Sequence, residues 1–432
     1  MQDLWANFAG EAIPTEAASR GGGSRQRRLT EQAVLTALRA WLLQDYMLPY
    51  GTSLGATRIF KRCYWIDGLG NARATSQTAI ALPQDEVDAP VRRGKQKMPT
   101  QASTLPPALQ SVATIARQLA RLERPIALRG FALDERRGKR KATRPARNGT
   151  EASAALDLPG EGGLLAGTWP ELAPALLAAL EQSAAVFLLN PLKDGLFRYT
   201  DLAPLYQRMA PTELFLWLSH KQIETRLLPG LRTAEGAAAL TNLLRGDRWK
   251  SLLVKADGEE NPERATSALI DLCAQSMRPH FLAVQRLPFP MRMGPALVEA
   301  APYTLLFATR RQDSLYSLND AVCQRARQLL AESHQGVLNE EWFASQRAEQ
   351  DAALREALTR ELLALGRAQR ARRWPDLRQQ LVLSHFGQHT LHDYDQIITS
   401  LLARGEVRCE WRKRTQDENE TPVPGNDDLL LW

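Results

Sequence analysis

The chain has 432 residues, of which 44% are hydrophobic and 24% are charged, and its formal net charge is +7. This length predicts two or three packed units, and the composition is that of a globular protein with apolar cores. No apolar run reaches the roughly 18 residues that span a bilayer, and the first residues lack a secretory signal pattern. We therefore expect a cytoplasmic protein without membrane contact.

The positive charge is concentrated in short basic runs. The longest, at residues 136–147, holds seven Lys or Arg and no acid; it includes Arg136, Arg137, Lys139, Arg140 and Lys141. Smaller runs lie at 92–97, 367–373 and 412–414. Each run by itself is typical of a solvated loop, but several on one chain favour contacts with phosphates. Nucleic acid is therefore the first partner that the sequence indicates.

The sequence predicts neither a metal site nor a disulfide. The cysteines lie far apart, without the close spacing of metal ligands, at Cys63, Cys273, Cys323 and Cys409. This pattern favours free, buried thiols in a reducing compartment. The spacing of His385, His389 and His392 resembles a metal-binding helix, but Gly387 interrupts the helix face between them.

The N-terminal part of the chain changes character near residue 29. Residues 1–28 end in the flexible basic stretch SRGGGSRQRR and predict a disordered segment. Thr30 then occupies a helix N-cap position, and apolar residues at helical spacing follow from Val34 to Tyr46. The stretch RCYWIDGLGNAR (62–73) reads as a buried strand that enters a glycine-containing loop.

Residues 29–339 predict a doubly wound, Rossmann-like α/β sheet domain. Helical patterns alternate with short apolar strands, and two strands follow one another at the end, which predicts an antiparallel pair at one sheet edge. The expected strands lie near 62–68, 125–135, 184–190, 212–219, 280–289 and 303–310. Two segments rich in polar residues, near 84–106 and 136–165, predict surface insertions.

The C-terminal part predicts a helical connector at 340–374 and a winged-helix domain at 375–432. After the connector come a helix, a glycine turn, a Thr-capped amphipathic helix and a basic strand. The outward residues of this unit are expected to include Arg404, Arg412, Lys413 and Arg414. Asp393 and Asp395, at the start of the second helix, would oppose a phosphate. The unit therefore predicts either nucleic-acid contact or protein docking.

Candidate ligand-binding residues follow two of the expected strands. In doubly wound folds, ligands bind outside the carboxyl ends of the strands. Gly68 and Gly70 would let the backbone of the loop that ends at Asn71 approach a ligand closely. Asp67 would either order this loop or accept a hydrogen bond from a ligand amino group. Asp134, after the second strand, would accept ribose hydroxyls, or it would cap a helix.

A third candidate lies at Asn190 and Pro191, after the next apolar strand. Enzymes that modify exocyclic amines use an Asn-Pro-Pro-aromatic loop that holds the target nitrogen and stacks on a flipped base. Here Leu192 and Lys193 stand in place of the second proline and the aromatic residue. A simple strand-terminating turn is therefore an alternative reading.

The order of these motifs resembles the three-Cys-motif partner proteins, a bacterial family of S-adenosylmethionine-dependent methyltransferase fold. DGLGNAR (67–73), Asp134 and NPLK (190–193) correspond to the glycine loop, the acid after the second strand and the Asp-Pro-Phe-Gly loop of that family. RGDRW (245–249) and residues 303–322 also resemble it. The resemblance runs from about Thr30 to the C-terminus.

This resemblance implies an S-adenosylmethionine site and a protein partner. The cofactor would lie on Asp67, Gly68, Gly70, Asn71 and Asp134, with Asn190 and Pro191 near the target. The partner would be a three-Cys-motif protein, in a mobile-element or antiviral context. The chain also departs from the family at Asn71 and Arg73, where glycines are expected, and at Asn190, where a carboxylate is expected.

Two hypotheses follow from the sequence. The first is a methyltransferase acting on or with nucleic acid, which the retained acids Asp67 and Asp134 favour. The second is a catalytically inactive subunit of the same fold that binds nucleic acid or serves as a scaffold. The missing glycines favour this second hypothesis.

Overall fold

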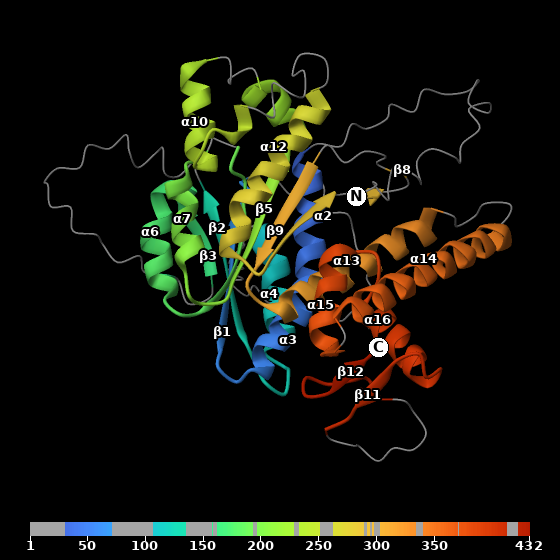
Figure 1. Cartoon of the computed structure of the whole chain (residues 1–432). Coiled ribbons are helices and arrows are strands. Elements are labelled where there is room, and N and C mark those ends of the chain that lie inside the picture. Colours follow the sequence, from blue (N-terminus) through green and yellow to red (C-terminus); the bar gives the residue numbers. More distant parts are fainter. Residues whose placement is uncertain are drawn as a thin grey trace, which may run out of the picture.

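The chain is described from a computed structural model. The described residues are 31–70, 107–134, 158, 162–192, 197–228, 233–250, 262–288, 292–293, 296–297, 303–333, 340–369, 371–412 and 422–432. The predicted disordered segment 1–28, the insertion near 84–106 and most of the insertion near 136–165 lie outside them. Figure 1 shows a sheet domain with helices on both faces and a smaller C-terminal unit at its side.

The centre of the molecule is a seven-stranded sheet with the order β3-β2-β1-β4-β5-β9-β6. Its parallel strands are β1 (Arg62–Gly68), β2 (Ala127–Asp134), β3 (Gly162–Ala166), β4 (Ala184–Leu189) and β5 (Thr212–Ser219). β9 (Tyr303–Thr309) runs antiparallel to both β5 and β6 (Ala283–Pro288). The predicted α/β class and the antiparallel pair at one edge are confirmed.

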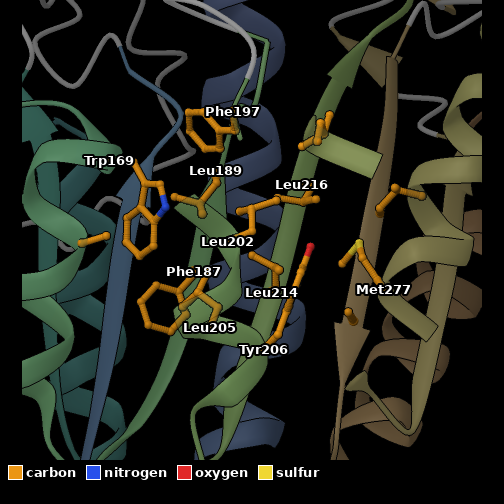
Figure 2. Packing of buried hydrophobic residues seen from close by; sticks show 14 of the residues in the cluster. Trp169, Phe187, Leu189, Phe197, Leu202, Leu205, Tyr206, Leu214, Leu216 and Met277 are labelled. Carbon is orange, nitrogen blue, oxygen red and sulfur yellow. The ribbon is translucent and has the colours of Figure 1, made fainter. Parts of the chain in front are cut away.

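Helices cover both faces of this sheet. One core lies under α2 (Glu31–Trp41), η1 (Leu42–Met47), α3 (Leu48–Ala56) and α4 (Pro107–Leu119). The other lies under α6 (Trp169–Leu180), α7 (Tyr199–Gln207), α10 (Ala234–Leu244) and α12 (Pro262–Met277), and Figure 2 shows part of it. β1 contributes Trp65 to the first core and Ile66 to the second, because successive strand residues point to opposite faces.

The strands of the centre are apolar because they are covered on both faces. Every residue of β4 and of β5 is buried, which explains why both appear in the sequence as continuous apolar runs. The edge strand β3 has the sequence GGLLA and was not expected, since it lies at the end of a segment predicted as an insertion. Short elements complete the domain: α8 (His220–Gln222), η3 (Ile223–Leu227), η4 (Arg278–His280), β7 (Arg292–Met293) and β8 (Ala296–Leu297).

The C-terminal unit follows two long helices. These are α13 (Gln312–Ser333) and α14 (Glu340–Gln369), the second of which covers most of the predicted connector. The unit itself consists of β10 (Ala371–Arg372), α15 (Trp374–Ser384), α16 (Leu391–Ala403), β11 (Arg408–Glu410) and β12 (Leu429–Leu431). The strands form an antiparallel sheet with the order β10-β12-β11. The expected helix pair and the strand after it are therefore present.

Hydrogen bonds fix the C-terminal unit to α13. The side chain of Asn319, which is fully buried, donates to the carbonyl of His389 (2.8 Å) and accepts from the amide of Gly387 (2.9 Å). Beside it, Asp320 accepts from the amide of Leu391 (2.9 Å). Since β9 runs antiparallel to β5, α13 begins at the amino ends of the parallel strands, and the unit is anchored toward that end of the domain (Figure 1).

None of the helices that the structure describes combines the length and the apolar character that crossing a bilayer requires.

Candidate functional site

The predicted ligand-binding residues meet at the carboxyl edge of the sheet. Asp67 lies in register with Ala132 of β2 and with Leu188 of β4. Asp134 and Asn190 follow these two partners by two residues each, so all three predicted residues lie at one edge of three neighbouring strands. The strand order changes direction between β1 and β4, which is where doubly wound folds hold their ligands.

Asp67 is buried and its carboxylate is held by the protein itself. The side chain is 1% exposed. Its Oδ2 accepts from Nε of Arg39 (2.6 Å), and its Oδ1 accepts from Nη2 of Arg39 (3.0 Å) and from the amide of Leu69 (3.1 Å). These contacts correspond to the loop-ordering role considered from the sequence.

Arg39, on α2, is a site residue that sequence reasoning missed. It is 5% exposed, and its Nη2 also donates to the carbonyl of Gly70 (2.8 Å). Bidentate pairing of a guanidinium with a carboxylate is directional and charge-assisted, so Arg39 holds both ends of the Asp67–Gly70 turn. A signal was present, because Arg39 lies four residues after Leu35 and three before Leu42, on the apolar face of the helix.

The two glycines of the turn have different physical roles. Gly70 has a φ of 80°, a left-handed conformation that favours glycine. A Cβ at Gly68 would lie 2.8 Å from Cδ2 of Leu189 and 3.2 Å from the carbonyl oxygen of Leu188. Gly68 therefore permits close packing of β1 against β4, a role that was not expected from the sequence. Asn71 lies outside the described residues.

Asp134 is the last residue of β2. It is 6% exposed, and its backbone carbonyl accepts from the amide of Gly167 (3.2 Å), which follows β3. A carboxyl group is thus present at the expected place, one strand away from the Asp67–Gly70 turn.

Asn190 and Pro191 form a closed turn after β4. Asn190 is 3% exposed, and its Oδ1 accepts from the amide of Leu192 (3.0 Å). The carbonyl of Pro191 accepts from the amide of Phe197 (3.0 Å). The amide oxygen of Asn190 is therefore used within its own turn, which matches the alternative reading of this motif. Lys193 lies outside the described residues.

A small cavity adjoins this turn on the α7–α10–α12 side. Pro191 and Leu192 line it together with apolar residues of β5 and these helices, and Figure 2 shows Leu202, Leu216 and Met277 among them. Its volume is about 20 Å³, which is roughly the space that one water molecule requires. This cavity has no room for a nucleobase, so it does not provide the base pocket that the motif comparison suggested.

Only part of the predicted nucleic-acid interface lies in described segments. Arg404 is exposed at the end of α16 and pairs with Glu406 (2.9 Å). Arg412 is exposed, and its backbone amide donates to Asp428 (2.9 Å). The residues outside the described segments are Arg136, Arg137, Lys139, Arg140, Lys141, Lys413 and Arg414.

The two aspartates at the start of α16 do not act as the sequence suggested. Asp393 is 3% exposed and pairs with Arg327 and with Arg355 (3.2 Å). Burial raises its pKa, but hydrogen bonds from Thr390 and the pairing with Arg327 outweigh this effect and lower the pKa to about 2. Asp395 pairs with Arg378 (2.8 Å). Both charges are neutralised internally, so neither opposes a phosphate at this surface.

Metal-ligating side chains do not gather in the described part of the chain. No group of three or more His, Cys, Asp or Glu there has an arrangement that could hold a metal ion. Nε2 of His385 lies 2.6 Å from Glu361. The four cysteines are free thiols, as predicted, with Cys63 and Cys323 buried.

Comparison of the chain with family models, curated proteins and solved structures gives no match.

Proposed function

We propose that the chain is an S-adenosylmethionine-dependent methyltransferase-type protein that acts on or with nucleic acid. The observation that carries this proposal is the strand order, in which the reversed strand β9 lies between β5 and β6. A seven-stranded sheet of this order is typical of methyltransferases that use this cofactor. It agrees with the fold that the resemblance to three-Cys-motif partner proteins implies, and from that resemblance we also propose such a protein as the partner.

The residues at the carboxyl edge fit part of this cofactor. The buried carboxylate of Asp134, one strand from the glycine turn, would accept hydrogen bonds from the ribose hydroxyls. The turn at Gly70, with Asn71 after it, would border the amino-acid end. Asp67 does not fit as a direct ligand, because both its oxygens already accept from Arg39 and Leu69. When bound, the cofactor would supply the methyl group, and these side chains would hold and orient it.

The C-terminal unit supports the nucleic-acid part of the proposal. Its elements follow the order strand, helix, helix, strand, strand, with β12 between β10 and β11, and we propose that it is a winged helix. The exposed face of α16 carries His392, Gln396, Ser400 and Arg404. Asp393 and Asp395 pair with arginines of the protein, so neither adds an unpaired negative charge to this face.

A second candidate function is a catalytically inactive subunit of the same fold. It is favoured by the closed turn at Asn190, whose Oδ1 accepts from the amide of Leu192. This candidate shares the fold and the proposed winged helix with the first but transfers no methyl group.

Ligand-induced stabilisation tests the cofactor site. A ligand at 100 times its Kd that binds only the native state stabilises it by about 2.7 kcal/mol. S-adenosylhomocysteine should therefore raise Tm by several degrees, and Asp134→Ala should abolish the gain. The matched control is Asp271→Ala, an aspartate on α12 whose side chain is 55% exposed.

The two outcomes of this test lead to different conclusions. No shift of the unchanged chain at millimolar ligand would contradict the enzyme and favour the inactive subunit. If the ligand binds, transfer of a labelled methyl group to DNA or RNA, with and without a three-Cys-motif partner, separates the enzyme from the inactive subunit.

A further inference from the structure

Arg39 has hydrogen-bonding capacity that its protein contacts do not use. A guanidinium carries five N–H donors. Nε donates to Asp67, and the two donors of Nη2 go to Asp67 and to the carbonyl of Gly70. The two donors of Nη1 make no hydrogen bond within the residues that the structure describes. The residue as a whole is 5% exposed.

The position of Arg39 connects it to the ligand edge. Its contact with the Gly70 carbonyl (2.8 Å) holds the guanidinium against the turn that borders the site. Asp67 occupies the Nε–Nη2 side, so Nη1 lies on the side of the guanidinium away from Asp67. An N–H donor of Nη1 on this fixed cation can make one charge-assisted hydrogen bond to a carboxylate oxygen.

We propose that Arg39 binds the carboxylate at the amino-acid end of the ligand through Nη1. This inference rests on the proposed cofactor. Arg39 and Asp134 would then hold opposite ends of one molecule, the carboxylate beside β1 and the ribose beside β2. Asp67 is a positioning residue in this arrangement, because it fixes the guanidinium and does not touch the ligand.

A pair of ligands separates this contact from a purely structural role. S-adenosylhomocysteine carries the carboxylate, whereas 5′-methylthioadenosine has the same nucleoside and thioether without the amino-acid end. Calorimetry should show that the unchanged chain binds the first at least about tenfold more tightly, as a charge-assisted hydrogen bond would. Arg39→Lys, which keeps a positive charge beside Asp67, should lower the affinity for S-adenosylhomocysteine about tenfold and leave that for 5′-methylthioadenosine within about twofold.

Asp67→Asn loosens the same ion pair but retains the guanidinium, so it tests the positioning role of Asp67. It should weaken the binding of S-adenosylhomocysteine more than that of 5′-methylthioadenosine, by a smaller factor than Arg39→Lys does. If Arg39→Lys lowers the affinity for both ligands by the same factor, Arg39 only orders the turn and the proposal is overturned. An equal affinity of the unchanged chain for the two ligands would overturn it even if Arg39→Lys failed to fold. If neither ligand binds the unchanged chain, the cofactor proposal itself fails.

Discussion

Glu213 is a buried acid at the start of β5 whose protonation affects stability. It is 0% exposed, and burial raises its pKa to about 7 against the opposing effects of the Thr309 and Ser314 hydroxyls and of Arg311. Between pH 4.5 and about 7 the unfolded chain releases this proton while the folded chain keeps it. The free energy of unfolding therefore falls as pH rises through this window, by about 3 kcal/mol in total.

Glu213→Gln should remove this dependence. The variant keeps the size of the side chain but has no charge to desolvate, so its free energy of unfolding at pH 8 should exceed that of the unchanged chain by up to about 3 kcal/mol. At pH 4.5 the difference should be small. Urea unfolding at both pH values measures it, with Glu235→Gln on the exposed side of α10 as the control. Identical pH profiles for the unchanged chain and Glu213→Gln would contradict the assignment.

For single residues, the sequence predicted where the candidate side chains lie better than it predicted what each of them does. Asp67, Asp134 and Asn190 were located because each follows a readable apolar strand, and the register brings all three to one edge. The role of Asp67 depends on Arg39, which lies 28 residues earlier in the chain. The helical pattern places Arg39 on the apolar face of α2, but its contact with Asp67 arises from how α2 packs on the sheet, which no local pattern encodes.

The contact between α13 and the start of α16 should have a stability that depends on pH. His389 lies in it at 4% exposure, and burial, with a smaller effect of neighbouring His385, lowers its pKa to about 4. Asp393 acts in the opposite direction, while Arg327 and Arg355 lower the pKa further. Between pH 6.5 and about 4 the unfolded state binds more protons at His389 than the folded state does. The stabilisation that neutral His389 contributes is therefore complete above pH 6.5 and is lost as pH falls.

His389→Phe should make this contact insensitive to pH in this window. A phenyl ring retains the edge contact with Tyr394, whose ring centroid lies 5.8 Å from that of His389, but cannot be protonated. Hydrogen exchange of the α16 amides should accelerate from pH 7 to pH 4.5 in the unchanged chain, beyond the intrinsic trend, by the equivalent of up to about 3 kcal/mol. His392→Gln, at an exposed position of α16, is the control and should behave like the unchanged chain. A pH response that persists in His389→Phe would assign it to another group.

Long elements were predictable and short ones were not. β4 and β5 are covered on both faces and therefore appear as apolar runs, and the Thr390 cap of α16 was readable because its side chain accepts from the amide of Asp393 (3.2 Å). β3, with its sequence GGLLA, and the two-residue β10 carry no such signal, since pairing with a neighbouring strand defines them.

At the scale of the whole molecule, the net charge of +7 predicts salt-dependent association with nucleic acid. Each neutralised phosphate releases counterions, so the slope of log affinity against log salt changes by about 0.9 per contact with duplex DNA. Replacing Arg412, Lys413 and Arg414 by Ala should make this slope shallower by up to about 2.7.

A matched variant separates local contacts from bulk charge. Replacing Arg117, Arg121 and Arg124 by Ala removes the same charge at exposed positions on and just after α4. Titrations at several salt concentrations should then give the slope of the unchanged chain. If both triple variants shift the slope equally, the positive charge acts only in bulk and the C-terminal unit is a protein-docking module.

The anchoring of the C-terminal unit by Asn319 has a consequence for what the molecule could modify. The unit sits toward the amino ends of the parallel strands, whereas Asp134 lies at their carboxyl ends (Figure 1). At about 3.3 Å per residue, the eight-residue strand β5 is on the order of 26 Å long from one of these ends to the other. A duplex that contacts α16 would need about eight base pairs, at roughly 3.4 Å each, to cover that length. The fold would thus fix the number of base pairs between the site where α16 contacts the duplex and the base that is modified.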